Sequence, residues 1–147
     1  MQTYQLREAL EGYENFNGVF PRDLLKSCVY RPGGYIVNTD PSMKPGEHWV
    51  ALFFDEQNRG EYFDPYGLPP MHSEIISFLD RYSCSQWSHN TQQLQSVLSI
   101  SCGYFCYLYQ VFRLNNLSLA DLQDFFTDKT VVNEVLLTYY AHLFHVQ

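Results

Sequence analysis

One cysteine in the sequence stands where a thiol could become a nucleophile. Cys102 follows the serine-rich run 96–101 and begins an apolar segment that extends to Leu114, which predicts a buried helix with Cys102 in its first turn. A thiol at a helix N-terminus meets the positive end of the helix dipole and unpaired backbone N–H groups, and both stabilise the thiolate. Free cysteines are also often buried for packing alone, so a structural role is the alternative.

Two further residues could complete a catalytic group with this thiol. His48 begins the predicted strand 48–55 and Asp64 ends the predicted strand 61–64, and the short polar connection between them favours an antiparallel hairpin. These two ends lie side by side in such a hairpin, so the carboxylate could orient the imidazole. If the helix packs its N-terminus against that end of the sheet, His48 can reach the thiol. A surface histidine and a turn-capping aspartate are the alternatives.

Residues around the thiol could bind the developing negative charge and the substrate. Gln95 precedes the helix and could aim its side-chain NH₂ at an oxyanion, with the backbone N–H of Cys102 as a second donor. Gly103 lacks a side chain and would allow a substrate backbone to approach closely. Gln95 could equally be an ordinary loop residue, so the spacing alone leaves the function open.

The elements that would position these residues follow from the spacing of apolar residues. The early strands and later helices do not alternate as βαβ units, which favours an α+β fold with a mixed or mostly antiparallel central sheet flanked by helices. We expect one domain over residues 1–147. Helices are predicted at 3–13, 21–25, 71–82, 102–114, 118–126 and 131–145, and strands at 35–38, 48–55, 61–64 and near Leu94.

Composition narrows the class of protein. The net charge of −7 argues against unaided binding of nucleic acid, which needs a basic surface. The sequence has no apolar run of about 18 residues, so we predict no membrane span, and its first residues lack the apolar core of a secretion signal. Four cysteines without a CxxC pair fit neither a disulfide framework nor a zinc site, and a reducing intracellular setting is expected.

Several stretches together resemble the adenovirus-type endopeptidase (adenain) family of cysteine proteases. The similarity runs from about residue 36 to residue 112, and the motifs are specific only in combination. They are Ile36-Val37-Asn38-Thr39, Gly46-Glu47-His48-Trp49, Tyr62-Phe63-Asp64-Pro65-Tyr66-Gly67, and Gln95 placed seven residues before Cys102-Gly103-Tyr104-Phe105-Cys106.

The resemblance implies a fold shared with the SUMO-type (Ulp-like) proteases and a role for each motif residue. It implies that Cys102 is the nucleophile, His48 the general base and acid, Asp64 the residue that orients His48, and Gln95 part of the oxyanion hole. Trp49 resembles a position that shapes the substrate groove. Adenain has Glu where this chain has Asp64, but the SUMO-type relatives use Asp, so catalysis should be preserved.

The family also implies substrates, partners and a setting. We expect a viral endopeptidase that cleaves virion precursor proteins at Gly-containing sites, in the host cell, including its nucleus, and in the virion. No cofactor is required by the chemistry, but an activating peptide from a virion protein is expected from the family, and Cys84 resembles the cysteine that forms a disulfide with that peptide. The negative charge makes the family's use of DNA doubtful here. The chain also ends closer to Cys102 than adenain does, so the region that supports the peptide is expected to be trimmed.

Other residues have simpler interpretations. Asn38 could contact substrate in the groove, although an asparagine at a strand end more often bonds the local backbone. Cys106 should be core, and Cys28 structural. His142 and His145 share a helix, but the sequence offers no third ligand beside them, so no metal site is expected.

Three other functions compete with the endopeptidase. An isopeptidase that acts on ubiquitin-like tails would use the same residues, because those tails end in Gly-Gly. An acyltransferase could share the His–acid–Cys order, but the sequence shows no site for the phosphates of acetyl-CoA. A binding domain on a decayed protease scaffold is disfavoured by the complete set of His48, Asp64, Gln95 and Cys102.

Overall fold

A five-stranded mixed sheet forms the centre of the protein in the computed structural model, which describes residues 1–44 and 48–144. The strand order is β1-β2-β3-β4-β5. The central pairs β2–β3 and β3–β4 are antiparallel, and the edge pairs β1–β2 and β4–β5 are parallel. The strands are β1 (Phe16–Pro21), β2 (Gly33–Asn38), β3 (Trp49–Phe54), β4 (Gly60–Phe63) and β5 (Ser88–His89).

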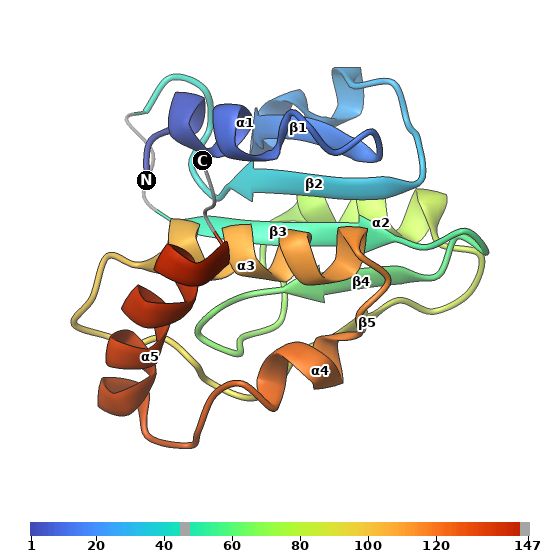
Figure 1. Ribbon diagram of the computed structural model, residues 1–147. Coiled ribbons are helices and arrows are strands. Elements are labelled where there is room, and N and C mark those ends of the chain that lie inside the picture. Colours follow the sequence, from blue (N-terminus) through green and yellow to red (C-terminus); the bar gives the residue numbers. More distant parts are fainter. Residues whose placement is uncertain (45–47, 145–147) are drawn as a thin grey trace.

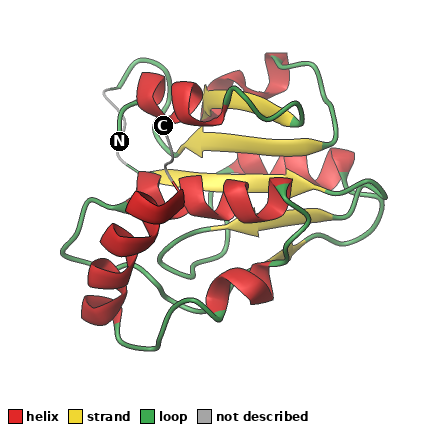
Figure 2. Ribbon diagram, viewed as in Figure 1, coloured by secondary structure: helices red, strands yellow, loops and turns green. Residues whose placement is uncertain are grey.

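Helices cover both faces of this sheet (Figures 1 and 2). Helix α3 lies along β3 on the face that is turned to the viewer in Figure 1, and α2 lies behind the sheet. The sheet is therefore the middle layer of three, and the fold is α+β, as the sequence predicts. The helices are α1 (Thr3–Leu10), the 3₁₀ helix η1 (Arg22–Ser27), α2 (Ser73–Tyr82), α3 (Cys102–Leu114), α4 (Leu119–Gln123) and α5 (Thr130–Phe144).

Each central strand contributes to two separate hydrophobic cores, because successive side chains point to opposite faces. On β3, Trp49, Ala51 and Phe53 pack in the core beneath α1, α3, α4 and α5. Val50, Leu52 and Phe54 pack in the second core, beneath η1 and α2. All six residues of β3 are buried, as the uninterrupted apolar run predicts for a central strand.

The hairpin prediction is confirmed, whereas both edge strands differ from expectation. Strand β1 is not predicted from the sequence, because Asn17 and Gly18 interrupt its apolar pattern. In the structure Gly18 adopts φ 131° beside an irregularity in the β1–β2 register. The short strand predicted near Leu94 is wrong. The strand is β5, which has only two residues and pairs with Glu61 and Tyr62.

The last helix is confirmed in position, but its apolar pattern does not show which side packs. The sequence groups Val132, Val135, Leu136, Tyr139 and Leu143 on one side, with Val146 outside the described residues. In the structure Val135 and Tyr139 are exposed, whereas Leu137 and the polar Asn133 are buried. Asn133 can be buried on the packed side of α5 because its side chain has hydrogen-bond partners. Across residues 1–44 and 48–144, no helix is long and apolar enough to cross a membrane.

Candidate active site

The β3–β4 hairpin brings His48 and Asp64 together at one end of the sheet. Ala51 pairs with Phe63, so the residue after β4, Asp64, lies opposite Val50, and His48 lies two residues further along the same strand face. His48 Nε2 donates to Asp64 Oδ1 at 2.8 Å. Both side chains are largely buried, so little water competes for this contact. The backbone N–H of Thr39 donates to His48 O at 2.9 Å and extends the β2–β3 pairing to the histidine.

Asp64 is itself held in place by several hydrogen bonds. Its Oδ1 also accepts the backbone N–H of Tyr66 at 2.8 Å, within a turn that Gly67 closes with φ 76°. The Asn90 side chain accepts the Asp64 backbone N–H at 2.9 Å and donates to the Asp64 carbonyl at 2.7 Å. Asn90 is buried, and Tyr66 stacks on the His48 ring with centroids 4.8 Å apart. The acid that orients the imidazole therefore has a fixed backbone and a fixed carboxylate.

Cys102 is the first residue of α3, as the sequence predicts, and it lies beside His48. Burial raises the pKa of the Cys102 thiol, but a hydrogen bond with His48 and backbone hydrogen bonds with Trp49 and Gly103 outweigh it and hold this pKa below its usual value. The two backbone groups and the nearby positive charge all favour the thiolate. The position gives Cys102 the electrostatic character of a nucleophile.

The pKa of His48 is displaced in the opposite direction. Burial lowers it, but hydrogen bonds with Asp64 and Cys102 and the charges of both partners raise the pKa of His48 to about 9. Because Nε2 bonds Asp64, the other ring nitrogen is the one left for the thiol. A lowered pKa of the thiol beside a raised pKa of the imidazole favours the thiolate–imidazolium pair over the neutral pair, and the charged pair can attack a carbonyl carbon and protonate a leaving group.

Gln95 is buried in the loop that leads to Cys102. Its Nε2 donates one hydrogen bond, to Ser99 O at 3.1 Å, and its Oε1 has no partner among the residues that the structure describes. The described hydrogen bonds thus connect the Gln95 side chain to its own loop rather than to Cys102 or His48. One of its two amide protons remains available for another acceptor.

The predicted groove residues Trp49 and Gly103 lie together, but the N-terminal residue packs against them. A Cβ placed on Gly103 would lie 3.1 Å from Met1 Cβ and 3.2 Å from Trp49 Cδ1. Trp49 Nε1 donates to Met1 O at 3.1 Å, and the indole is only 9% exposed. Met1 and Trp49 therefore occupy the space beside Gly103 that, from the sequence, we expect a substrate backbone to use.

Asn38 pairs with Trp49 in the sheet, so the structure does bring it to the same end. Its Oδ1 accepts the backbone N–H of Asp40 at 2.8 Å, which is the local backbone contact that the sequence offered as the alternative to a substrate contact. The two roles are compatible, because Asn38, Trp49 and Lys44 line the same small surface cavity of about 170 Å³.

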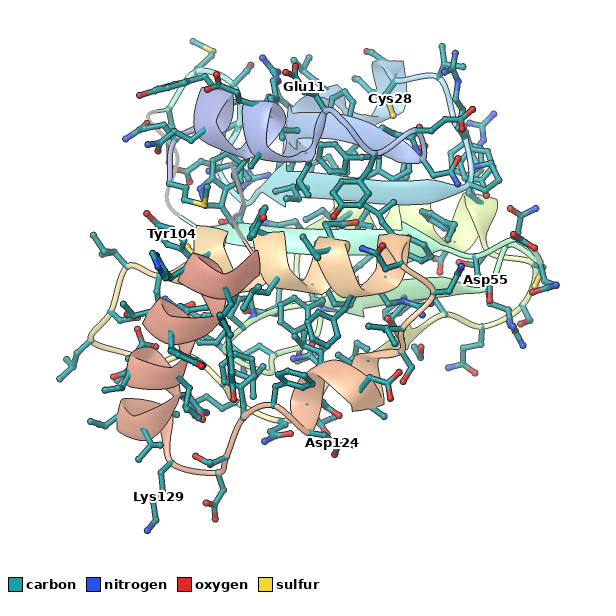
Figure 3. The ribbon with its side chains drawn as sticks, viewed as in Figure 1. Glu11, Cys28, Asp55, Tyr104, Asp124 and Lys129 are labelled. Atoms are coloured by element: carbon teal, nitrogen blue, oxygen red, sulfur yellow. The ribbon has the colours of Figure 1, made fainter. Side chains whose placement is uncertain are left out.

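The other cysteines and His142 of α5 lie outside this group. Cys84 is exposed, and its backbone N–H donates to Asn58 O in the β3–β4 turn, at the end of the sheet opposite to His48. In Figure 3 the labelled Asp55 marks that far end, and Tyr104 marks the end where α3 begins. Cys106 is buried and donates to Trp49 O at 3.3 Å, so it belongs to the core, as predicted. His142 lies on α5, and His145 is outside the described residues.

The support that Asn90 gives to Asp64 is not predicted from the sequence. Asn90 lies in a polar stretch that carries no apolar pattern, and only its place between β5 and Gln95 hints at a role. Tyr66 belongs to the motif that carries the family resemblance, but its stacking on the imidazole depends on the turn geometry and could not be inferred from the sequence.

The chain is similar to viral proteases over much of its length. The model of the adenovirus endoprotease family matches residues 15–131. A cysteine protease of African swine fever virus is 29% identical over 124 residues, which cover 77% of this chain and 44% of the relative. The protease of snake adenovirus serotype 1 is 34% identical over 89 residues, covering 50% of this chain and 43% of that relative. This chain thus spans less than half the length of these two relatives.

The fold is also similar to that of a solved protease. A crystal structure of an African swine fever virus protease superposes with a TM-score of 0.70 at 20% sequence identity, covering 99% of this chain and 67% of that chain. This likeness supports the three-layer architecture described above. The family match extends over most of the chain and includes His48, Asp64 and Cys102. The chain therefore belongs to the adenovirus endoprotease family.

Proposed function

We propose that this protein is a cysteine endopeptidase in which Cys102 is the nucleophile, His48 the general acid and base, and Asp64 the orienting carboxylate. One observation carries the proposal: the His48 imidazole donates to Asp64 at 2.8 Å and lies close enough to Cys102 that each group shifts the pKa of the other, the thiol's downward and the imidazole's upward. A chain of acid, imidazole and thiol is the arrangement that activates a sulfur nucleophile.

The chemistry follows from these groups. The Cys102 thiolate attacks the scissile carbonyl carbon, and the carbonyl oxygen becomes an oxyanion that the second Gln95 amide proton and the backbone N–H of Cys102 stabilise. The C–N bond breaks as the His48 imidazolium gives its proton to the leaving amine, which leaves a thioester. His48 then takes a proton from water, the hydroxide attacks the thioester, and the carboxylic acid product leaves as the thiolate is restored. These side chains and backbone groups, together with one water molecule, supply every proton and charge of the route.

The substrates that we propose are virion precursor proteins cleaved at Gly-containing sites, in the infected cell and in the virion. The resemblance of the sequence motifs to adenain and the viral origin of the similar proteins support this setting. An activating peptide remains part of the proposal, and the exposed thiol of Cys84 would be available to it.

Cleavage of a glycine-containing peptide library, read by mass spectrometry, tests the activity. We expect Cys102→Ala to abolish cleavage while circular dichroism and the unfolding midpoint stay close to those of the unaltered protein. Cys28→Ala is the matched control, because it removes another free thiol that has no part in the proposed chemistry, and it should keep cleavage. Unchanged turnover by Cys102→Ala would exclude the proposed nucleophile.

An isopeptidase acting on ubiquitin-like proteins is the second candidate, because several African swine fever virus relatives are named SUMO-1 cysteine proteases. A ubiquitin-like protein with a C-terminal electrophile separates the two functions. Labelling of Cys102 by this probe requires space for a folded modifier, whereas an endopeptidase that accepts only extended chains reacts with short peptide probes alone.

A further inference from the structure

The loop that joins Gln95 to Cys102 presents its apolar side chains to water. Leu98 and Ile100 are each 93% exposed, and Val97 is 72% exposed. These side chains cannot fix the loop by packing, because exposed apolar groups gain no burial. Leu94 and Cys102 pack in one core and anchor the chain at the two ends of the loop, so the stretch between them is held by polar contacts.

A carboxylate on α5 contacts both ends of this loop. Glu134 Oε2 accepts the backbone N–H of Ser96, the residue after Gln95, at 3.2 Å. Glu134 Oε1 accepts the hydroxyl of Ser101, the residue before Cys102, at 2.7 Å. One side chain thus spans the interval between the two residues that would stabilise the oxyanion.

Asn133, the residue before Glu134 on α5, bonds the backbone of Leu94, which precedes Gln95. The buried Asn133 amide donates to Leu94 O at 3.2 Å and to Thr127 O at 2.8 Å, and its Oδ1 accepts the backbone N–H of Thr127 at 2.7 Å. Asn133 thereby joins α5 to Leu94 and to Thr127. These contacts hold the helix, and with it Glu134, beside the loop.

Ser101 has the position of a helix N-cap but does not act as one. Its side chain makes no capping hydrogen bond to α3, and its hydroxyl bonds Glu134 and Ser99 instead. Removal of this hydroxyl should therefore change the loop without weakening the start of the helix. The Ser101–Glu134 contact can be tested separately from the stability of α3.

We infer that Glu134 is a positioning residue that holds Gln95 and the backbone of Cys102 in the geometry needed to bind the oxyanion. The inference rests on the proposed protease function. It assigns a task to α5, a helix that supplies none of the four proposed site residues. Displacement of a positioned group by about 1 Å can lower a rate by about a hundredfold, so a brace at this place would matter.

The test compares two reactions of the same thiol. Alkylation of Cys102 by iodoacetamide displaces iodide at a saturated carbon and forms no oxyanion, whereas peptide cleavage does. We expect Glu134→Ala to lower kcat for peptide cleavage about tenfold to a hundredfold, with KM and the alkylation rate changed less than about twofold. Glu134→Gln should recover most of kcat, since its amide oxygen can accept from Ser96 while its NH₂ donates to the Ser101 hydroxyl.

Val135→Ala is the matched control, because this neighbouring side chain is 70% exposed. Ser101→Ala removes the hydrogen bond between Ser101 and Glu134 while keeping Glu134. It therefore provides a second test if Glu134→Ala does not fold. In the double variant the two losses should not add, because they remove one shared contact. Cleavage by Glu134→Ala at the rate of the unaltered protein, equal losses of cleavage and alkylation, or additive losses in the double variant would each overturn the inference. An unaltered protein that is alkylated but cleaves no peptide would refute the proposed function itself.

Discussion

Replacement of Asp64 by asparagine should narrow the pH range over which the protein is active. The substitution keeps an oxygen that can accept from both His48 Nε2 and the Tyr66 backbone N–H, each of which lies 2.8 Å from Asp64 Oδ1. It removes the negative charge. The hydrogen-bond geometry can therefore persist while the electrostatic support of the imidazolium is lost.

The magnitude follows from the pKa of His48. Burial opposes the charged ring, yet its partners raise the pKa from 6.5 to about 9. This difference corresponds to about 3 kcal/mol in favour of the protonated ring. An adjacent charge of opposite sign changes a pKa by about 1–3 in comparable pairs. Asp64→Asn should therefore bring the pKa of His48 down to about 6–8, and the thiolate, having lost part of its counter-ion, should become harder to form.

The direction of the pH effect on activity follows from the protonation state that reacts. Turnover needs the Cys102 thiolate and the His48 imidazolium, so kcat/KM rises as pH increases through the thiol pKa and falls as pH increases through about 9. In Asp64→Asn the falling limb should move to lower pH. If the pKa of His48 falls to about 7, activity at about pH 8 is about tenfold lower from this cause alone.

A fluorogenic peptide assay between about pH 5 and about pH 10 would measure both limbs. Asp124→Asn is the matched control, because it removes an exposed carboxylate at the end of α4 and should leave both limbs in place. A falling limb near pH 9 in Asp64→Asn would show that the carboxylate does not set the charge of His48, and the electrostatic reasoning would fail.

Three further substitutions test the packing that supports the site, each by urea unfolding. Cys106→Ala should lower the free energy of unfolding by about 1–2 kcal/mol, because Trp49 O loses its thiol donor in the core, with cleavage retained; loss of cleavage instead would give Cys106 a part in the chemistry. Gly34→Ala should lower the free energy of unfolding by about 1–3 kcal/mol, because its Cβ would clash with the buried Gln110 Oε1, and an unchanged midpoint would contradict this clash. Ser118→Ala should cost about 1 kcal/mol through loss of the N-cap of α4, and equal stability would mean that the cap contributes nothing.

The parts of the fold that follow apolar periodicity could be predicted from the sequence. The β3–β4 hairpin and the start of α3 at Cys102 are examples, because an unbroken apolar run or a change from polar to apolar residues marks each of them. Once the hairpin is known to be antiparallel, the proximity of His48 and Asp64 follows from geometry. The packing of α3 against β3, which delivers Cys102 to that end, is a tertiary contact that the pattern alone does not determine.

The parts that could not be predicted depend on polar residues with buried partners. The apolar pattern of α5 includes Val135 and not the polar Asn133, yet Asn133 is fully buried and Val135 is exposed. Strand β1 was missed for a related reason. The strand includes Gly18 and pairs with β2 through backbone hydrogen bonds, which depend little on the types of the residues.

Buried amides have a consistent task near the candidate site. Asn90 holds the backbone of Asp64, Asn133 holds the backbone beside Gln95, and the Gln95 amide bonds its own loop. A neutral amide both donates and accepts, so it can fix two backbone groups without adding a charge. A charged side chain buried at these places would perturb a thiolate–imidazolium pair through the weakly screened interior. The buried amides therefore fix the geometry of the site without adding a charge, whereas the charged support, Glu134, is only partly buried.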